Sequence, residues 1–125
     1  MFEKHRQAYY NNIMLENRKN PRFRSFAQVR IPNILGGEHL LKDISITGCC
    51  IEFTVITEIQ PNNRYQIEVI PEKASKLGSF ELTVECRWVH GSSDSSDIGF
   101  SVIASPKGRL FQRYVDYLAY RNSLL

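Results

Sequence analysis

A strict alternation of apolar and polar residues between positions 80 and 88 limits what this chain can fold into more than any other feature. One face of this run consists of Phe80, Leu82, Val84, Cys86 and Trp88, and the other of Glu81, Thr83, Glu85 and Arg87. A period of two places successive side chains on opposite sides of an extended backbone. The run therefore predicts a β-strand with one apolar face and one polar face.

Further short runs with strand character occur along the chain, and turn residues separate them. They lie at residues 27–31, 38–46, 49–55, 65–69 and 98–102, with polar turns at 33–37 and 91–97. Six short strands at regular spacing favour a closed antiparallel β-barrel. The expected fold class is therefore dominated by β structure.

Two helices are predicted outside the strands. Ser105 and Pro106 provide a helix start, and apolar residues then recur at Leu110, Phe111, Tyr114, Val115 and Leu118. This pattern predicts a C-terminal helix over about 106–121 that covers an opening or edge of the barrel. Residues 3–16 show a helical spacing that predicts a short amphipathic helix. We therefore expect one domain over 17–125, preceded by an N-terminal extension over 1–16 that contains this helix.

Composition limits the class of protein. With 125 residues and 42% hydrophobic content, the chain can build one core without disulfides or structural metal. No apolar run approaches the roughly 20 residues of a membrane span, and the first residues lack the apolar stretch of a secretory signal. We therefore expect a cytoplasmic protein without membrane insertion. The three cysteines, Cys49, Cys50 and Cys86, are expected to be reduced core thiols.

The basic charge is concentrated in one segment. The net charge is only +3, yet residues 17–37 contain five basic residues and no acidic one. Arg18 and Arg22 lie four apart around Pro21, which favours an extended or turning linker that leaves both side chains available. A guanidinium group can bond phosphate oxygens or the guanine edge in a bidentate manner, or stack on a purine. An isolated pair of this kind is more often a solvated linker.

A second polar cluster follows at Asp43, Ser45 and Gly48. Alternation over residues 38–46 places Leu40, Lys42, Ile44 and Ile46 on one face and Leu41, Asp43 and Ser45 on the other. We therefore expect Asp43 and Ser45 to lie together on an outward face, where a carboxylate can accept from guanine. Gly48 permits an unusual backbone conformation or a close approach. The alternative is a turn that binds nothing, and both interpretations can hold together.

These two clusters resemble the hallmark of the PilZ domain family, an R-x-x-x-R arm followed by D/N-x-S-x-x-G. Here the arm is Arg18 and Arg22, and the second motif is Asp43, Ser45 and Gly48. The resemblance extends to residues 87–89, to residues 98–100 and to the predicted C-terminal helix, and covers roughly residues 17 to 121. It implies a six-stranded PilZ-type barrel.

The resemblance also implies a ligand, the bacterial second messenger cyclic di-GMP. Arg18 and Arg22 would hold guanine and phosphate, Asp43 would bond guanine, Ser45 would bond phosphate or guanine, and Gly48 would shape the turn. Asn17 stands where some members of the family have a further arginine. The protein could therefore bind either one cyclic di-GMP molecule or a stacked pair. Alternation places Trp88 on the apolar face, so we expect it in the core. Trp88 and Asn17 are therefore only second-rank candidates for contact with the ligand.

Other functions have weaker support in the sequence. No catalytic motif is present, and no metal-ligand spacing is complete, so we expect neither an enzyme nor a metal site or cofactor. One rival, which we do not expect, is a barrel that binds single-stranded nucleic acid through residues 17–37. Another is a PilZ-like protein adaptor without a nucleotide. The expected output is a protein partner in motility, pilus or polysaccharide regulation.

Overall fold

A computed structural model describes most of the chain after the N-terminal segment. The described residues are 20–32, 34, 37–55, 57–91, 94–106 and 108–123. The helix predicted over 3–16 lies outside them, as do Asn17 and Arg18.

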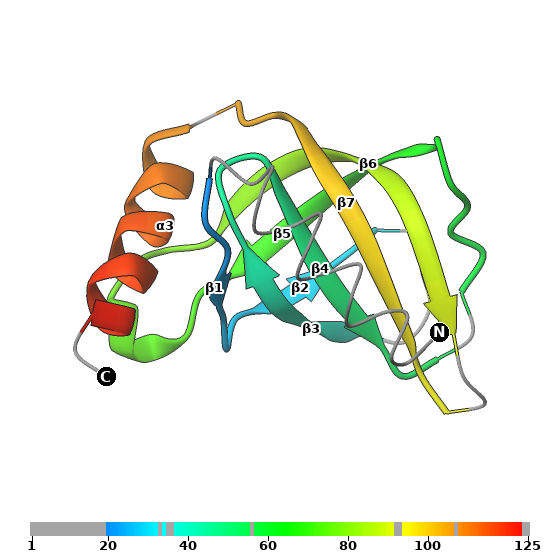
Figure 1. Cartoon of the computed structure of the whole chain (residues 1–125), viewed down its shortest axis with the longest axis horizontal. Helices are drawn as coiled ribbons and strands as arrows, with labels where there is room; N and C mark the ends of the chain where they lie inside the picture. The colour runs from blue at the N-terminus through cyan, green and yellow to red at the C-terminus, as the bar shows by residue number, and fades with distance from the viewer. Residues whose placement is uncertain are drawn as a thin grey trace.

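The strands form one antiparallel sheet that closes on itself (Figure 1). They are β1 (Phe23–Arg24), β2 (Gln28–Arg30), β3 (Glu38–Ile44), β4 (Gly48–Phe53), β5 (Arg64–Ile70), β6 (Phe80–Gly91) and β7 (Ser96–Ala104). The order is β1-β3-β2-β5-β6-β7-β4, and β3 also pairs with β4. This last pairing closes the ring, so the sheet is a barrel.

The strands β1 and β2 are two parts of one interrupted strand. Both pair with β3, β1 beside its end and β2 beside its start. Between them, Ser25 N donates to Lys42 O at 3.0 Å, and Leu41 N donates to Ala27 O at 3.0 Å. The barrel is therefore six-stranded, as the sequence predicts.

The barrel interior is filled by apolar side chains from every strand pair. Its largest fully buried members include Phe53, Phe100, Leu41, Ile44, Ile51, Ile67, Leu82 and Ile98. Burying one such side chain contributes about 1.5–3 kcal/mol relative to leaving it in water. The predicted alternation therefore supplies the core, and the three cysteines are buried and free of disulfides.

Three register shifts interrupt this alternation. They lie between Leu41 and Asp43 in β3, and between Thr83 and Val84 and between Cys86 and Trp88 in the pairing of β6 with β7. A bulge adds one residue to a strand and reverses the faces of the residues beyond it. Leu41 and Ile44 are therefore both fully buried, whereas Leu40 is 40% exposed. The faces predicted for Leu40 and Leu41 are wrong for this reason, whereas Ile44 faces inward and Asp43 outward as predicted.

The C-terminal helix α3 (Gly108–Ser123) lies at one end of the barrel (Figure 1). It begins at Gly108, and the Ser105 hydroxyl has no hydrogen-bond partner among the described residues, so the predicted cap at Ser105 does not form. Its apolar face, with Phe111, Tyr114 and Leu118, packs into the core as the sequence predicts. In the part of the chain that the structure describes, no helix is long and apolar enough to cross a membrane.

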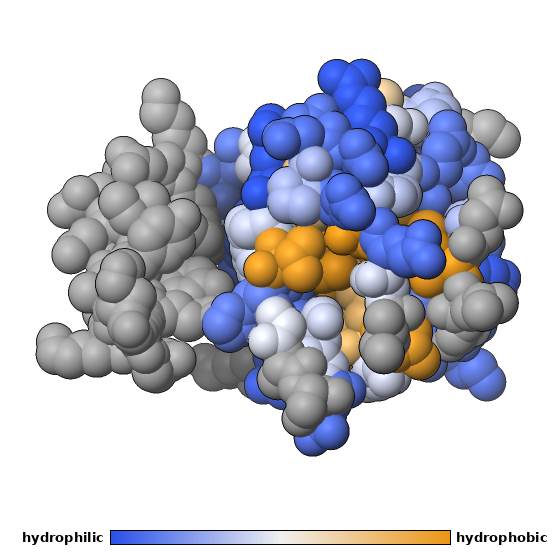
Figure 2. Space-filling view, turned by 90° about the vertical axis from the view of Figure 1, so that its right-hand side faces the viewer, coloured by the Kyte–Doolittle hydropathy of each residue, from blue (hydrophilic) through white to orange (hydrophobic). Residues whose placement is uncertain are grey.

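The opposite end of the barrel, at the right of Figure 1, has exposed apolar residues below a band of hydrophilic ones (Figure 2). Strand ends that meet there belong to β3, β4, β6 and β7 (Figure 1). Three apolar residues near these strand ends are exposed: Leu40 of β3 (40%), Val89 of β6 (43%) and Val55, two residues beyond β4 (36%). The helix thus covers one end of the barrel, and the other end keeps exposed apolar surface.

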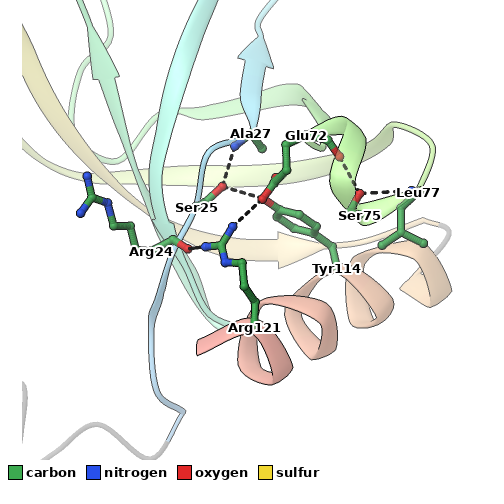
Figure 3. Close-up of polar contacts among 8 residues, drawn as sticks. All are labelled: Arg24, Ser25, Ala27, Glu72, Ser75, Leu77, Tyr114 and Arg121. Atoms are coloured by element: carbon green, nitrogen blue, oxygen red, sulfur yellow. Dashed lines mark hydrogen bonds and ion pairs between the residues drawn. The ribbon is translucent and has the colours of Figure 1, made fainter. Parts of the chain in front are cut away.

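A polar network joins α3 to the segment after β1 (Figure 3). The Tyr114 hydroxyl donates to Glu72 Oε1 at 2.7 Å, so the Ser25 hydroxyl, also at 2.7 Å, must donate to Tyr114. Arg121 donates to Glu72 Oε2 at 2.7 Å and to Arg24 O at 2.6 Å. Burial raises the pKa of Tyr114, which keeps its hydroxyl protonated and able to donate. The network fixes the chain immediately after Arg22.

Candidate ligand site on the outer face of the barrel

Arg22 and Asp43 form an ion pair on the outside of the barrel. Arg22 Nη1 lies 3.2 Å from Asp43 Oδ1, and the two side chains are 22% and 36% exposed. Asp43 faces outward because the bulge in β3 separates it from the buried Leu41. The pairing of β1 with β3 brings Arg22 beside this carboxylate, since Phe23 is opposite Ile44. The tertiary structure thus brings together the second arginine of the arm and the aspartate of the second motif.

Ser45 has a different position from the predicted one. It is fully buried, and its hydroxyl accepts from Thr47 N at 3.1 Å and from Gly48 N at 3.2 Å. The strand β3 ends at Ile44, so alternation does not extend to Ser45. The predicted outward placement beside Asp43 is therefore wrong, and the hydroxyl shapes the turn between β3 and β4.

Gly48 occupies a place where no larger residue fits. A Cβ atom added there would lie 2.7 Å from Phe100 O and 3.1 Å from Arg22 Nη2. Gly37 is the one glycine with a left-handed backbone among the described residues, so Gly48 is needed for space and not for its backbone conformation. Its missing side chain lets the Arg22 guanidinium lie directly over the start of β4.

Small residues cover the outer surface beyond Arg22. Gly48 is opposite Ser101, and Cys50 is opposite Gly99, in the pairing of β4 with β7. These four residues, which we call the small-residue floor, face outward because their neighbours Cys49 and Phe100 are buried. Burial, with a smaller contribution from Asp43, raises the pKa of Cys50 to about 12, so its thiol is neutral. The floor therefore carries no charged side chain.

Trp88 borders this floor and does not face the core. The bulge after Cys86 places Trp88 opposite Gly99, and a Cβ atom at Gly99 would overlap the indole ring. Gly99 faces outward because Ile98 and Phe100 are buried, so the indole lies on the outer face. The predicted place of Trp88 on the apolar face is wrong. The observed cross-strand row runs Arg24, Asp43, Cys50, Gly99 and Trp88.

Replacing Gly99 with alanine should displace the indole of Trp88, because a methyl group has no room beneath the ring. We expect a loss of about 1–3 kcal/mol of stability, as in other overpacked sites. Trp88 is the only tryptophan, so its fluorescence reports the change directly. The emission maximum should move to longer wavelength as the ring enters water. An unchanged spectrum in a folded variant would show that the indole does not lie on Gly99.

The sequence did not indicate that Cys50, Gly99 and Ser101 belong to this surface. Nothing in the local pattern shows that β4 pairs with β7, because the two strands are far apart in the chain. Arg18 and Asn17 lie outside the described residues, so their predicted roles stay predictions. No group of His, Cys, Asp or Glu side chains in the described ranges is arranged to hold a metal ion.

The family model of the PilZ domain matches residues 16–118. The chain belongs to the PilZ domain family. A search of curated proteins finds no match.

Solved structures with the same fold include three proteins of low sequence identity. The inhibitor of motility MotI/DgrA of Bacillus subtilis has a TM-score of 0.71 and 16% identity, and covers 86% of this chain and 52% of its own. The MrkH complex with c-di-GMP from K. pneumonia has a TM-score of 0.65 and 16% identity, and the match covers 86% of this chain and 53% of MrkH. The PilZ domain of Escherichia coli YcgR with c-di-GMP has a TM-score of 0.62 and 19% identity, and the match covers 86% of this chain and 95% of the YcgR domain. The chain thus spans about half the length of the first two proteins.

Proposed function

We propose that this protein is a receptor for cyclic di-GMP. Arg22 bonds phosphate or guanine, and Asp43 accepts from the N1 and N2 donors of guanine. Arg18, from the same arm, adds a second guanidinium. Ser45 and Gly48 shape the turn that supports them, while Trp88 and Asn17 are second-rank contacts. Membership of the PilZ family and the c-di-GMP complexes of MrkH and YcgR support this ligand.

The observation that best supports the proposal is the Arg22–Asp43 pair beside the small-residue floor. Both partners are partly exposed, and such pairs contribute only about 0–1 kcal/mol. A cyclic dinucleotide offers each partner a replacement, phosphate oxygens for Arg22 and guanine donors for Asp43. Opening the pair therefore costs little, and the ligand gains two charge-assisted contacts.

The proposed output is a change in the arm that a protein partner detects. A ligand shifts a conformational equilibrium only by its difference in affinity for the two states. Arg22 belongs to the arm, whereas Asp43 belongs to the barrel, so a ligand held by both favours the closed arrangement. The partner would belong to the control of motility, pili or polysaccharide synthesis.

Titration calorimetry of the native chain with cyclic di-GMP, GTP and a short single-stranded RNA tests the proposal. We expect saturable binding of cyclic di-GMP with a Kd of about 1 μM or tighter. GTP and RNA should bind far more weakly. No heat with cyclic di-GMP well above micromolar concentration would contradict the proposal. RNA binding that weakens steeply with salt would instead support the nucleic-acid alternative, and binding of neither would support a protein adaptor.

A further inference from the structure

Arg87 lies at the far side of the small-residue floor from Asp43. It is the extra residue of the bulge in β6, between Cys86 and Trp88. Its Nε donates to Ser101 Oγ at 2.9 Å, and its Nη1 lies 3.2 Å from Glu85 Oε2. The side chain is 54% exposed. The bulge thus brings a guanidinium group and the neighbouring indole to the same outer face.

The guanidinium groups of Arg22 and Arg87 occupy neighbouring places over the floor. Arg22 Nη2 lies over Gly48, 3.1 Å from where a Cβ atom would be, and Arg87 is bonded to Ser101. Gly48 and Ser101 are directly paired across β4 and β7. Paired strands are about 4.8 Å apart. The separation of the two anchoring residues is therefore of the size that one phosphate group can bridge.

Each of these two guanidinium groups lies beside a carboxylate, which reduces the repulsion between them. Arg22 is paired with Asp43 and Arg87 with Glu85. Arg87 uses Nε and Nη1 in these contacts, and among the described residues Nη2 has no recorded acceptor. The two N–H groups on Nη2 of Arg87 are thus available to an anion on the floor.

We propose that Arg87 is a further ligand-binding residue, which bonds a phosphate of the cyclic dinucleotide together with Arg22. This inference rests on the proposed function and extends its site across the floor to β6. The phosphate lies between the two guanidinium groups, beside the paired residues Gly48 and Ser101, which carry no charge that would repel it. The ligand is then held by the arm at one side and by the bulge at the other.

The competing explanation is a solvated ion pair that only stabilises the sheet. Arg64, on β5, provides a control for it, because its Nε lies 3.1 Å from the other oxygen of the same Glu85. Arg64 is 62% exposed, and it projects from β5, the strand beyond β6 as seen from the floor. Glu85 therefore has a second cation, and its charge does not require Arg87.

The test compares Arg87→Gln with Arg64→Gln by titration calorimetry with cyclic di-GMP. Both variants lose one positive charge and one ion pair to Glu85, so their long-range electrostatic effects are similar. We expect Arg87→Gln to weaken binding by about 10- to 100-fold, because it removes a charge-assisted guanidinium–phosphate contact. Arg64→Gln should stay within about threefold of the native chain.

Arg87→Lys provides a second measurement, because lysine keeps the charge but loses the planar fork. Its affinity should lie between that of the native chain and that of Arg87→Gln. Equal affinities for Arg87→Gln and Arg64→Gln, in variants that melt like the native chain, would overturn the assignment of Arg87. If the native chain itself does not bind cyclic di-GMP, the proposed function fails. Failure of the Arg87 assignment alone would leave binding by the native chain intact.

Discussion

Arg22→Ala should weaken binding of cyclic di-GMP by about 100-fold or more. The substitution removes a guanidinium that pairs with Asp43 at 3.2 Å and lies over Gly48. Hydrogen bonds to charged groups contribute about 1.5–3 kcal/mol each, and about 1.4 kcal/mol corresponds to a tenfold change in Kd. Loss of two such bonds therefore reduces affinity by at least two orders of magnitude. Titration calorimetry measures this change.

Arg30→Ala is the matched control for this experiment. Arg30 is on β2 and forms exposed pairs with Glu38 and Glu68, so the variant has the same change in net charge. Its affinity should stay within about threefold of the native value. If Arg22→Ala melts like the native chain and binds equally well, the site lies elsewhere, even if cyclic di-GMP is the ligand.

Tyr114→Ala should have the largest effect on stability, a loss of about 4 kcal/mol in the free energy of unfolding. Tyr114 is fully buried, and its ring lies 6.0 Å from that of Phe80. Replacing a buried aromatic residue by alanine costs about 3–5 kcal/mol. The variant also leaves Ser25 and Glu72 without the hydroxyl that joins them. Urea unfolding followed by circular dichroism measures the loss.

Tyr114→Phe separates the two contributions, because it keeps the ring and removes only the hydroxyl. We expect this variant to lose about 1–3 kcal/mol, the cost of a buried polar group left without its partner. If the alanine and phenylalanine variants unfold at the same urea concentration, the packing of the ring contributes little. The helix α3 would then be held mainly by the Arg121 and Glu72 contacts.

Much of the fold was predictable because it depends on local periodicity. The run Phe80–Trp88 alternates strictly, and β6 spans it. The apolar spacing from Leu110 to Leu118 similarly places α3, although its first residue differs by two. Closure into a barrel followed from the number of strands. Period and length are properties of neighbouring residues, so they can be seen without the tertiary structure.

The candidate site was predictable only in part. The motif residues Arg22, Asp43 and Gly48 do come together at one place. Ser45 turned inward because β3 ends one residue earlier. Trp88 turned outward because a bulge precedes it. A single inserted residue reverses every side chain beyond it, and simple alternation does not reveal where a bulge occurs.

The sequence by itself determined the six strands, the C-terminal helix and the two motifs, because each depends on residues close together in the chain. Only the tertiary structure decided which small residues meet on the outer face. Gly48 and Ser101 become neighbours through the pairing of β4 with β7. That pairing depends on closure of the whole barrel, and it places Arg22 and Arg87 at the same surface.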